Sequence, residues 1–161
     1  MSEKYKVLIV CTGNTCRSPM AEGILRHLFK ERSIDNIEVS SAGTSAVDGI
    51  PAAENGIIVC RDWGIDISNH LSRKLTQGML ESSDLVLAMS PDHLKTIRSV
   101  SPVDEKLYLV KSFPEKPNNL NMEAVDDPIG GSLEIYSRTF LELDEILRKA
   151  LPTIIEFSKK K

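Results

Sequence analysis

The chain alternates between short, continuous apolar runs and longer stretches in which apolar residues recur every three or four positions. A continuous apolar run rich in β-branched residues predicts a buried strand, because both faces of such a strand are covered in a parallel sheet. Residues 5–10, 84–89 and 106–110 contain runs of this character, and residues 37–41, IEVSS, are interpreted as a further short strand. The sequence therefore predicts four strands spread along the chain.

Helices are predicted between and after these strands. Met20, Ile24 and Leu28 recur every four positions, which predicts a helix that ends at about residue 30. Ser18-Pro19 precedes them and is typical of an N-cap followed by a first helical residue. Three further helices are predicted: one after Pro51 that ends before Gly64, one from Ser90-Pro91, and one from about Leu133 into the C-terminal lysines, in which Pro152 can cause a kink.

This alternation predicts an α/β fold in which a parallel sheet carries helices on both faces. No repeat or boundary divides the chain, so we expect a single domain over residues 1–161. Parallel sheets of this kind bind their ligands beyond the carboxyl ends of the strands. The segment directly after the first strand and the long irregular loop at 112–131 are therefore the first candidates for a functional site.

Composition narrows the function classes. The chain has 161 residues, a net charge of −3 and 27% charged residues, which does not indicate a nucleic-acid-binding surface. No segment approaches the roughly 18 apolar residues of a membrane helix, and no signal peptide is recognisable. Three cysteines and three scattered histidines match neither a disulfide framework nor a structural zinc site. We expect a cytoplasmic protein without a metal.

Residues 10–18, VCTGNTCRS, join the end of the first strand to the start of the first helix. The backbone N–H groups of such a loop, together with the N-terminus of the helix, can bind an oxyanion. Gly13 permits a positive φ or a close backbone approach, and Asn14 tolerates a left-handed conformation. Arg17 adds a planar fork that can hold two phosphate oxygens. The loop is therefore suited to binding phosphate.

Cys11 lies at the base of this loop. The positive field that binds phosphate also favours a thiolate, so we expect the pKa of Cys11 to lie below the ~8.5 of a free cysteine, with Ser18 as a possible hydrogen-bond donor to the sulfur. A thiolate beneath a bound phosphate is an in-line nucleophile. A lone cysteine after a strand is usually structural, but the combination C-x5-R-S at a strand-to-helix junction is much more specific.

Transfer of phosphate to sulfur also requires a general acid for the leaving group. Asp126-Asp127-Pro128 lies in the long loop at 112–131. Proline pushes the residue before it into an extended conformation, which can direct the Asp127 carboxyl group into the site. Asp-Pro on its own is ordinary turn chemistry, so Asp127 is a candidate acid only in combination with the phosphate-binding loop.

The N-terminal CTGNTCRSPMAE and the late DDPIGGSLEIY resemble the low-molecular-weight protein phosphatase family, and the resemblance covers nearly the whole chain. It implies a doubly wound, flavodoxin-like four-stranded parallel sheet and a cysteinyl-phosphate intermediate, with no metal or organic cofactor. It also implies that Cys11 is the nucleophile, that Arg17 grips the phosphate and that Asp127 is the general acid and base. The remaining implied site residues are those of the phosphate-binding loop, Thr12, Gly13, Asn14, Thr15, Cys16, Arg17 and Ser18, and two that hold the loop through Asn14, namely Ser41 and His70.

Two branches of the family compete for the substrate. The tyrosine branch uses a slot with aromatic walls, whereas Ile129 and Val47 occupy the corresponding positions here. Thr15 in the loop and GGS-x-x-IY after Asp-Pro more closely resemble the protein-arginine phosphatases, and Asp127, together with Asp126, could pair with a guanidinium. We therefore favour phosphoarginine in proteins as the substrate over phosphotyrosine.

Other functions fit less well. Arsenate reduction on the same fold needs two further cysteines, and residues 81–99 contain none. A non-catalytic phosphate-binding module would not need both Cys11 and Asp127. Cys16 is either a resolving partner for oxidised Cys11 or a small residue that fills the loop, and Cys60 is expected in the core. We expect phosphorylated proteins as partners, no nucleic acid or membrane, and a monomer.

Overall fold

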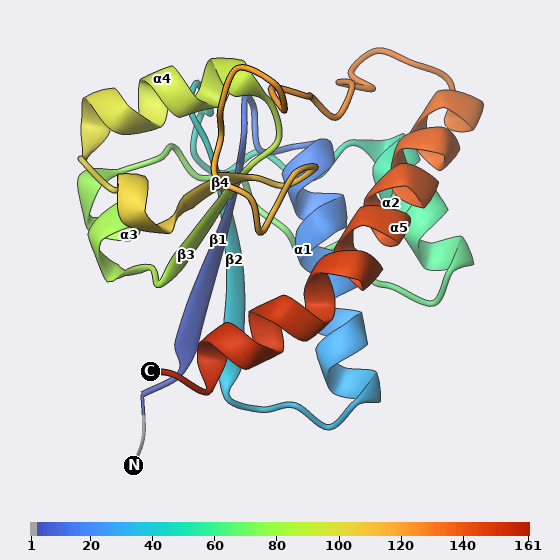
Figure 1. The fold of residues 1–161 in the computed structure, drawn as a ribbon. Coiled ribbons are helices and arrows are strands. Elements are labelled where there is room, and N and C mark those ends of the chain that lie inside the picture. Colours follow the sequence, from blue (N-terminus) through green and yellow to red (C-terminus); the bar gives the residue numbers. More distant parts are fainter. Residues whose placement is uncertain (1–2) are drawn as a thin grey trace.

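The computed structural model describes residues 3–161 and contains a four-stranded parallel sheet. The strand order is β2-β1-β3-β4, so the chain moves from β1 to one edge and then crosses to the other side (Figure 1). The direction in which strands are added to the sheet therefore reverses after β2, with β2 and β3 on either side of β1. This is a doubly wound order, and it confirms the predicted fold class. The strands are β1 (Tyr5–Cys11), β2 (Ile37–Gly43), β3 (Leu85–Ala88) and β4 (Leu107–Leu109).

Helices cover both faces of the sheet (Figure 1). Alternate residues of β1 point to opposite faces, so Val7 and Ile9 join one hydrophobic cluster while Leu8 and Val10 join the other. The first cluster lies beneath α1, α2 and α5, and the second beneath α3 and α4. The helices are α1 (Arg17–Glu31), α2 (Glu54–Asp62), α3 (Gln77–Ser82), α4 (Pro91–Val100) and α5 (Leu133–Ser158), with a short 3-10 turn, η1, at Asp104–Lys106.

The start of α1 differs from the prediction. Ser18 is not the N-cap: the helix begins at Arg17, and Cys16 is the N-cap residue, whose side chain makes no capping hydrogen bond to the helix. The Ser18 hydroxyl instead forms hydrogen bonds with the Cys11 sulfur and with the side-chain amide of Asn14. The hydroxyl that would cap the helix is therefore used to organise the loop before it.

Other boundaries differ by a few residues. The second predicted helix begins at Glu54, because Pro51 forms a β-bridge with Leu71 and the Ala53 N–H donates to the carbonyl of Thr15 in the loop. The second predicted strand extends to Gly43, where it pairs with Cys11. Short helix α3 was not predicted. The last helix runs through Pro152 to Ser158.

The carboxyl ends of the strands form one edge of the sheet, and the loop after β1 lies there (Figure 1). The long loop between β4 and α5 returns across the same edge. It is fixed to the sheet at Val125, whose N–H donates to the carbonyl of Met89 at 2.9 Å, directly after β3. The two segments that the sequence singled out are therefore brought together.

Within residues 3–161, no helix is both long and apolar enough to cross a membrane. No three His, Cys, Asp or Glu side chains in this same part of the chain gather into a group that could hold a metal ion.

Candidate active site

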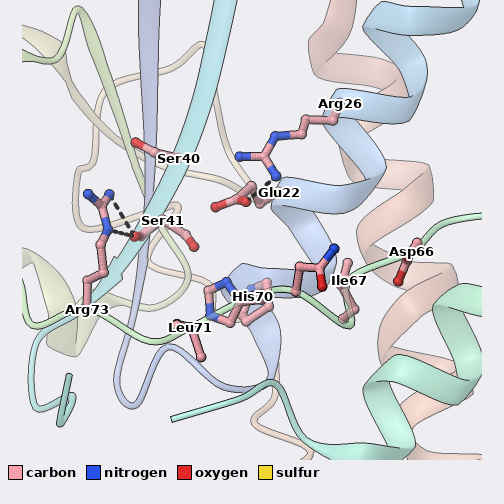
Figure 2. Close-up of a pocket in the computed structure, with 11 residues that line it drawn as sticks. Glu22, Arg26, Ser40, Ser41, Asp66, Ile67, His70, Leu71 and Arg73 are labelled. Carbon is pink, nitrogen blue, oxygen red and sulfur yellow. Dashed lines mark hydrogen bonds and ion pairs between the residues drawn. The ribbon is translucent and has the colours of Figure 1, made fainter. Parts of the chain in front are cut away.

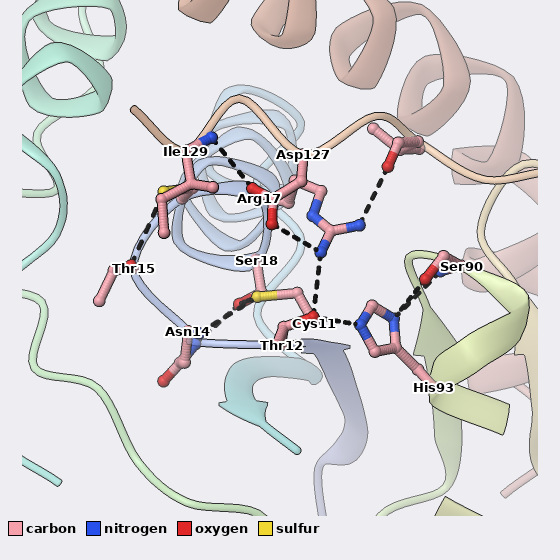
Figure 3. A network of polar contacts seen from close by, with 12 residues as sticks. Cys11, Thr12, Asn14, Thr15, Arg17, Ser18, Ser90, His93, Asp127 and Ile129 are labelled. Atoms are coloured by element: carbon pink, nitrogen blue, oxygen red, sulfur yellow. Dashed lines mark hydrogen bonds and ion pairs between the residues drawn. The ribbon is translucent and has the colours of Figure 1, made fainter. Parts of the chain in front are cut away.

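The loop after β1 curls around the sulfur of Cys11. Asn14 adopts a left-handed conformation with φ of 57°, and its backbone N–H lies 3.3 Å from the Cys11 sulfur (Figure 3). Gly13, which the sequence also offered for a positive φ, does not adopt one. Asparagine tolerates this conformation better than most other residues, so the tight turn depends on Asn14.

Asn14 is fully buried, and every polar atom of its side chain has a partner. Its amide nitrogen donates to the hydroxyl oxygens of Ser18 at 2.8 Å and Ser41 at 2.9 Å. Its amide oxygen accepts from the backbone N–H of Arg73 at 2.8 Å, and its carbonyl lies 2.7 Å from Nε2 of His70. The structure thus brings Ser41 and His70 to the loop and adds Arg73, which sequence reasoning missed.

A polar cavity of about 460 Å³ lies behind the loop (Figure 2). Ser41, His70 and Arg73 line one part of it, and the ion pair between Glu22 and Arg26, 2.7 Å apart, lines another. Its lining contains no cysteine, and the cavity at Cys11 is much smaller, about 90 Å³. We therefore assign the chemistry to the smaller cavity, because that one contains a nucleophile and a phosphate-binding loop.

Burial is the strongest influence on the thiol of Cys11 and raises its pKa, which is the opposite of the expected direction. Hydrogen bonds with Ser18, the charge of Arg17 and the backbone N–H of Asn14 act against burial and lower the pKa. The Ser18 hydroxyl accepts a hydrogen bond from Asn14, so its own proton is free to donate to the sulfur 2.8 Å away. These groups would all stabilise a thiolate.

Arg17 is buried beside Cys11, and all but one of its donor atoms are engaged. Nη1 donates to the carbonyl of Val125 at 3.0 Å, and Nη2 lies 3.3 Å from the Thr12 hydroxyl and 3.4 Å from Asp127 Oδ2 (Figure 3). Nε is buried and has no hydrogen-bond partner within residues 3–161. A buried, unpaired guanidinium N–H is costly, and an anion bound in the cavity would satisfy it.

Asp127 lies at the mouth of the cavity, with its side chain 38% exposed. Its Oδ1 accepts from the backbone N–H of Ile129 at 3.1 Å, while Oδ2 faces Arg17. Because the chain two residues earlier is fixed to both Met89 and Arg17 through Val125, the carboxylate is held over the loop. Asp126 is exposed and does not line the cavity.

The small cavity is narrow and has no aromatic side chain in its lining, as far as residues 3–161 are concerned. Ile129 forms part of its rim and is 68% exposed. Val47 was expected to stand at a second wall, but it is exposed and does not line the cavity. The lining consists of Cys11, Thr12, Gly13, Thr15, Cys16, Arg17, Asp127 and Ile129.

All three cysteines are free thiols, and all are buried. The Cys16 sulfur lies 3.2 Å from the hydroxyl of Tyr136, and Cys16 also lines the small cavity. Cys60, on the buried face of α2, lies in the core as expected, where burial raises the pKa of its thiol to about 12.

His93 is a second residue of this site that sequence reasoning missed. His93, in the first turn of α4, is buried, and its Nε2 lies 2.8 Å from the Thr12 hydroxyl. It follows β3 by five residues, so a search for polar residues after each strand end would have found it.

Comparison with known proteins agrees with this geometry. Residues 6–160 match the family described as low molecular weight phosphotyrosine protein phosphatase. A protein-arginine-phosphatase of Bacillus subtilis (strain 168) is 37% identical over 144 residues, which cover 89% of this chain and 92% of the relative.

Two solved structures extend the comparison. A low molecular weight protein tyrosine phosphatase from T. tengcongensis superposes with a TM-score of 0.83 at 38% identity, covering 93% of this chain and 99% of that one. A Cys-to-Ser mutant of the YwlE arginine phosphatase with a phosphorylated active-site serine gives a TM-score of 0.84 at 35% identity, covering 92% of this chain and 95% of that one. The chain therefore belongs to the low molecular weight phosphotyrosine protein phosphatase family, whose members are cysteine-dependent protein phosphatases.

Proposed function

We propose that the protein hydrolyses phosphoarginine in proteins, with Cys11 as the nucleophile, Arg17 as the phosphate-gripping residue and Asp127 as the general acid and base. The observation that carries this proposal is the lining of the small cavity. It contains the buried Cys11 sulfur, Arg17 with its unpaired Nε, and the carboxyl group of Asp127 at the mouth, and within residues 3–161 it contains no aromatic ring. Its chemistry suits a phosphoryl group attached to a thin, cationic side chain.

In the first step, the phosphoryl group lies in the loop, where it accepts hydrogen bonds from the backbone and from Arg17. The Cys11 thiolate attacks phosphorus, an S–P bond forms and the P–N bond to the guanidine breaks. The electron pair of that bond stays on the leaving nitrogen, which takes a proton from Asp127. Asp127 lines the cavity, and its partly exposed carboxyl group supports this role as the proton donor to the leaving group.

In the second step, water attacks the cysteinyl-phosphate and Asp127, now a carboxylate, takes its proton. The S–P bond breaks, inorganic phosphate leaves and the thiolate is restored. Thr15 lines the cavity, and its hydroxyl can help to orient the attacking water. Cys11 supplies the first nucleophile, water the second, and Asp127 transfers the protons, so the proposed reaction requires no cofactor.

The walls favour arginine over tyrosine. A phenyl ring would gain about 0.5–1.5 kcal/mol from each aromatic partner, and the cavity lining offers none. A guanidinium instead can donate a hydrogen bond to a carboxyl oxygen of Asp127, which a phenyl ring cannot do. Thr15 lines the cavity, and a β-branched side chain there would leave more room for a thin side chain than for a ring. Similarity to the Bacillus subtilis protein-arginine-phosphatase supports the same choice.

Phosphotyrosine is the second candidate. The T. tengcongensis structure, a low molecular weight protein tyrosine phosphatase, is as similar to this chain as the arginine phosphatases are. Its similarity keeps tyrosine as the alternative that an experiment must exclude. We further propose that the protein acts as a monomer in the cytoplasm, where a reducing environment keeps its three free thiols reduced.

The test compares kcat/KM for two peptides that differ only in carrying phosphoarginine or phosphotyrosine. We expect at least about a tenfold preference for phosphoarginine, which corresponds to roughly 1.4 kcal/mol in the transition state. Thr15→Ile should reduce that preference, and Cys11→Ser should abolish both activities. A preference for phosphotyrosine would assign the protein to the alternative, and no turnover of either by reduced protein would refute the phosphatase assignment.

A further inference from the structure

His93 is a buried histidine beside the phosphate-binding loop, and the reaction described so far does not use it. It lies in the first turn of α4, on the opposite face of the sheet from α1, and only 3% of it is exposed. Its ring spans the gap between Ser90, the N-cap of α4, and Thr12, the residue after Cys11 (Figure 3). It therefore connects a helix terminus to the phosphate-binding loop.

The hydrogen bonds of the ring determine which nitrogen carries the proton. The backbone N–H of Ser90 can only donate, and it points at Nδ1 of His93 from 3.1 Å. Nδ1 is therefore an acceptor, and in the neutral ring the proton lies on Nε2. Burial, reinforced by the nearby charge of Arg17, lowers the pKa of His93 to about 4, so the ring is neutral at physiological pH.

Protonated Nε2 donates to the hydroxyl oxygen of Thr12, 2.8 Å away. The same oxygen lies 3.3 Å from Nη2 of Arg17, which also can only donate. A hydroxyl oxygen has two lone pairs, and these two donors use both of them. The hydroxyl proton of Thr12 then remains available to donate a hydrogen bond. Thr12 lines the cavity in which the phosphoryl group is proposed to bind.

We propose that His93 is a positioning residue of the phosphatase: it orients the Thr12 hydroxyl so that its oxygen holds Nη2 of Arg17 and its proton is available to the phosphoryl group. Thr12 then contributes one hydrogen bond to the transferring group, and Arg17 is held with Nε free to contribute another. The inference rests on the proposed reaction at Cys11, and it does not depend on which phosphorylated residue is the substrate.

A role in capping α4 alone would use only one of the two ring nitrogens of His93. The N-cap interaction with Ser90 uses only Nδ1, whereas the contact with Thr12 uses Nε2. These two functions can be separated by substitution, because an asparagine side chain places a polar atom near the position of Nδ1 and a glutamine side chain places one near that of Nε2. His93→Asn keeps an acceptor for Ser90 and loses the donor to Thr12, whereas His93→Gln keeps a donor for Thr12.

The experiment measures kcat and KM with p-nitrophenyl phosphate, an aryl ester that reports on the Cys11 chemistry without a peptide. We expect His93→Asn to lower kcat by about tenfold, as for a weakened transition-state hydrogen bond, and KM to change less than twofold. His93→Gln should recover most of the lost kcat. His27→Asn, a change to a partly exposed histidine paired with Glu31 on α1, should leave both constants unchanged.

A double-mutant cycle tests whether His93 acts through Thr12. In a Thr12→Val background, which has no hydroxyl, His93→Asn should cause little further loss of kcat. Full additivity would overturn the proposal, as would a His93→Asn enzyme with unchanged kcat. If wild-type protein does not hydrolyse the ester at all, the proposed phosphatase reaction itself fails, which is a different outcome from an active enzyme that is insensitive to His93.

A measurement on the wild-type protein avoids any dependence on folded variants. In 15N-histidine-labelled protein at neutral pH, the ring of His93 should show a protonated Nε2 and an unprotonated Nδ1. A proton on Nδ1, in either the other tautomer or the imidazolium, would overturn the assignment.

Discussion

Replacing Asn14 by alanine should destabilise the whole protein by about 4 kcal/mol, because this residue both adopts a strained backbone conformation and holds the loop. The buried side chain makes three hydrogen bonds, with Ser18, Ser41 and the N–H of Arg73. At about 1 kcal/mol each, they contribute roughly 3 kcal/mol. Alanine at a φ of 57° costs about 1 kcal/mol more, since alanine tolerates the left-handed region less well than asparagine.

The two contributions can be separated by comparing alanine with glycine. Asn14→Gly removes the same hydrogen bonds but not the conformational preference, so it should lose about 1 kcal/mol less than Asn14→Ala. Urea unfolding followed by far-UV circular dichroism gives the free energy of unfolding of each variant. Asn69→Ala, at an exposed asparagine, is the matched control and should change it by less than about 0.5 kcal/mol. A loss below about 1 kcal/mol for Asn14→Ala, or a glycine variant less stable than the alanine variant, would refute this reasoning.

Three further substitutions test separate parts of the site. Ser18→Ala removes a group that lowers the pKa of Cys11, so the thiol should titrate at higher pH and its alkylation by iodoacetamide at neutral pH should slow about tenfold; an unchanged or faster rate would contradict this. Gly43→Ala places a Cβ 2.5 Å from the carbonyl oxygen of Thr12 and should lower the free energy of unfolding, measured in urea, by about 1–3 kcal/mol. Gly78→Ala, whose Cβ would have its nearest side-chain neighbour beyond the adjacent residues at 4.0 Å, should not lower it, and equal effects would refute the close-approach argument. Arg17→Lys keeps the charge but loses the planar fork, so kcat/KM for p-nitrophenyl phosphate should fall by about a hundredfold or more, and a lysine enzyme within about threefold of wild type would show that charge alone suffices.

The fold was predictable because its signals are local. Three of the strands contain continuous apolar runs, and the first β-strand, its loop and the following helix are adjacent in sequence. Helix α3 was missed because six residues are too few to show a helical period, and only the Thr76 cap marks its start. Ser18 was misassigned as a cap because a serine before a helix has the same signature whether its hydroxyl bonds the helix or, as here, the Cys11 sulfur.

The parts of the site that the sequence did not indicate all depend on long-range contacts. His93 reaches Thr12, and Arg73 reaches Asn14, across separations that only the folded sheet brings together. Gly43 matters because the backbone of the catalytic loop passes against it, and nothing in its own neighbourhood in sequence reveals this. The direction of the Cys11 pKa was also wrong, since the extent of burial that opposes the loop's positive field is a property of the packed structure.

The most direct test of the proposed function is to detect phosphate on Cys11 after reaction with a phosphoarginine-containing protein. Rapid acid quenching of wild-type protein during turnover, followed by mass spectrometry of the peptide containing Cys11, can identify the intermediate while Asp127 is present for its formation. We predict a phosphorylated Cys11, matched by loss of phosphate from arginine, and no phosphate on the corresponding peptide of Cys11→Ala protein. Release of phosphate from arginine by active enzyme without any phosphocysteine under these conditions would contradict the proposed mechanism.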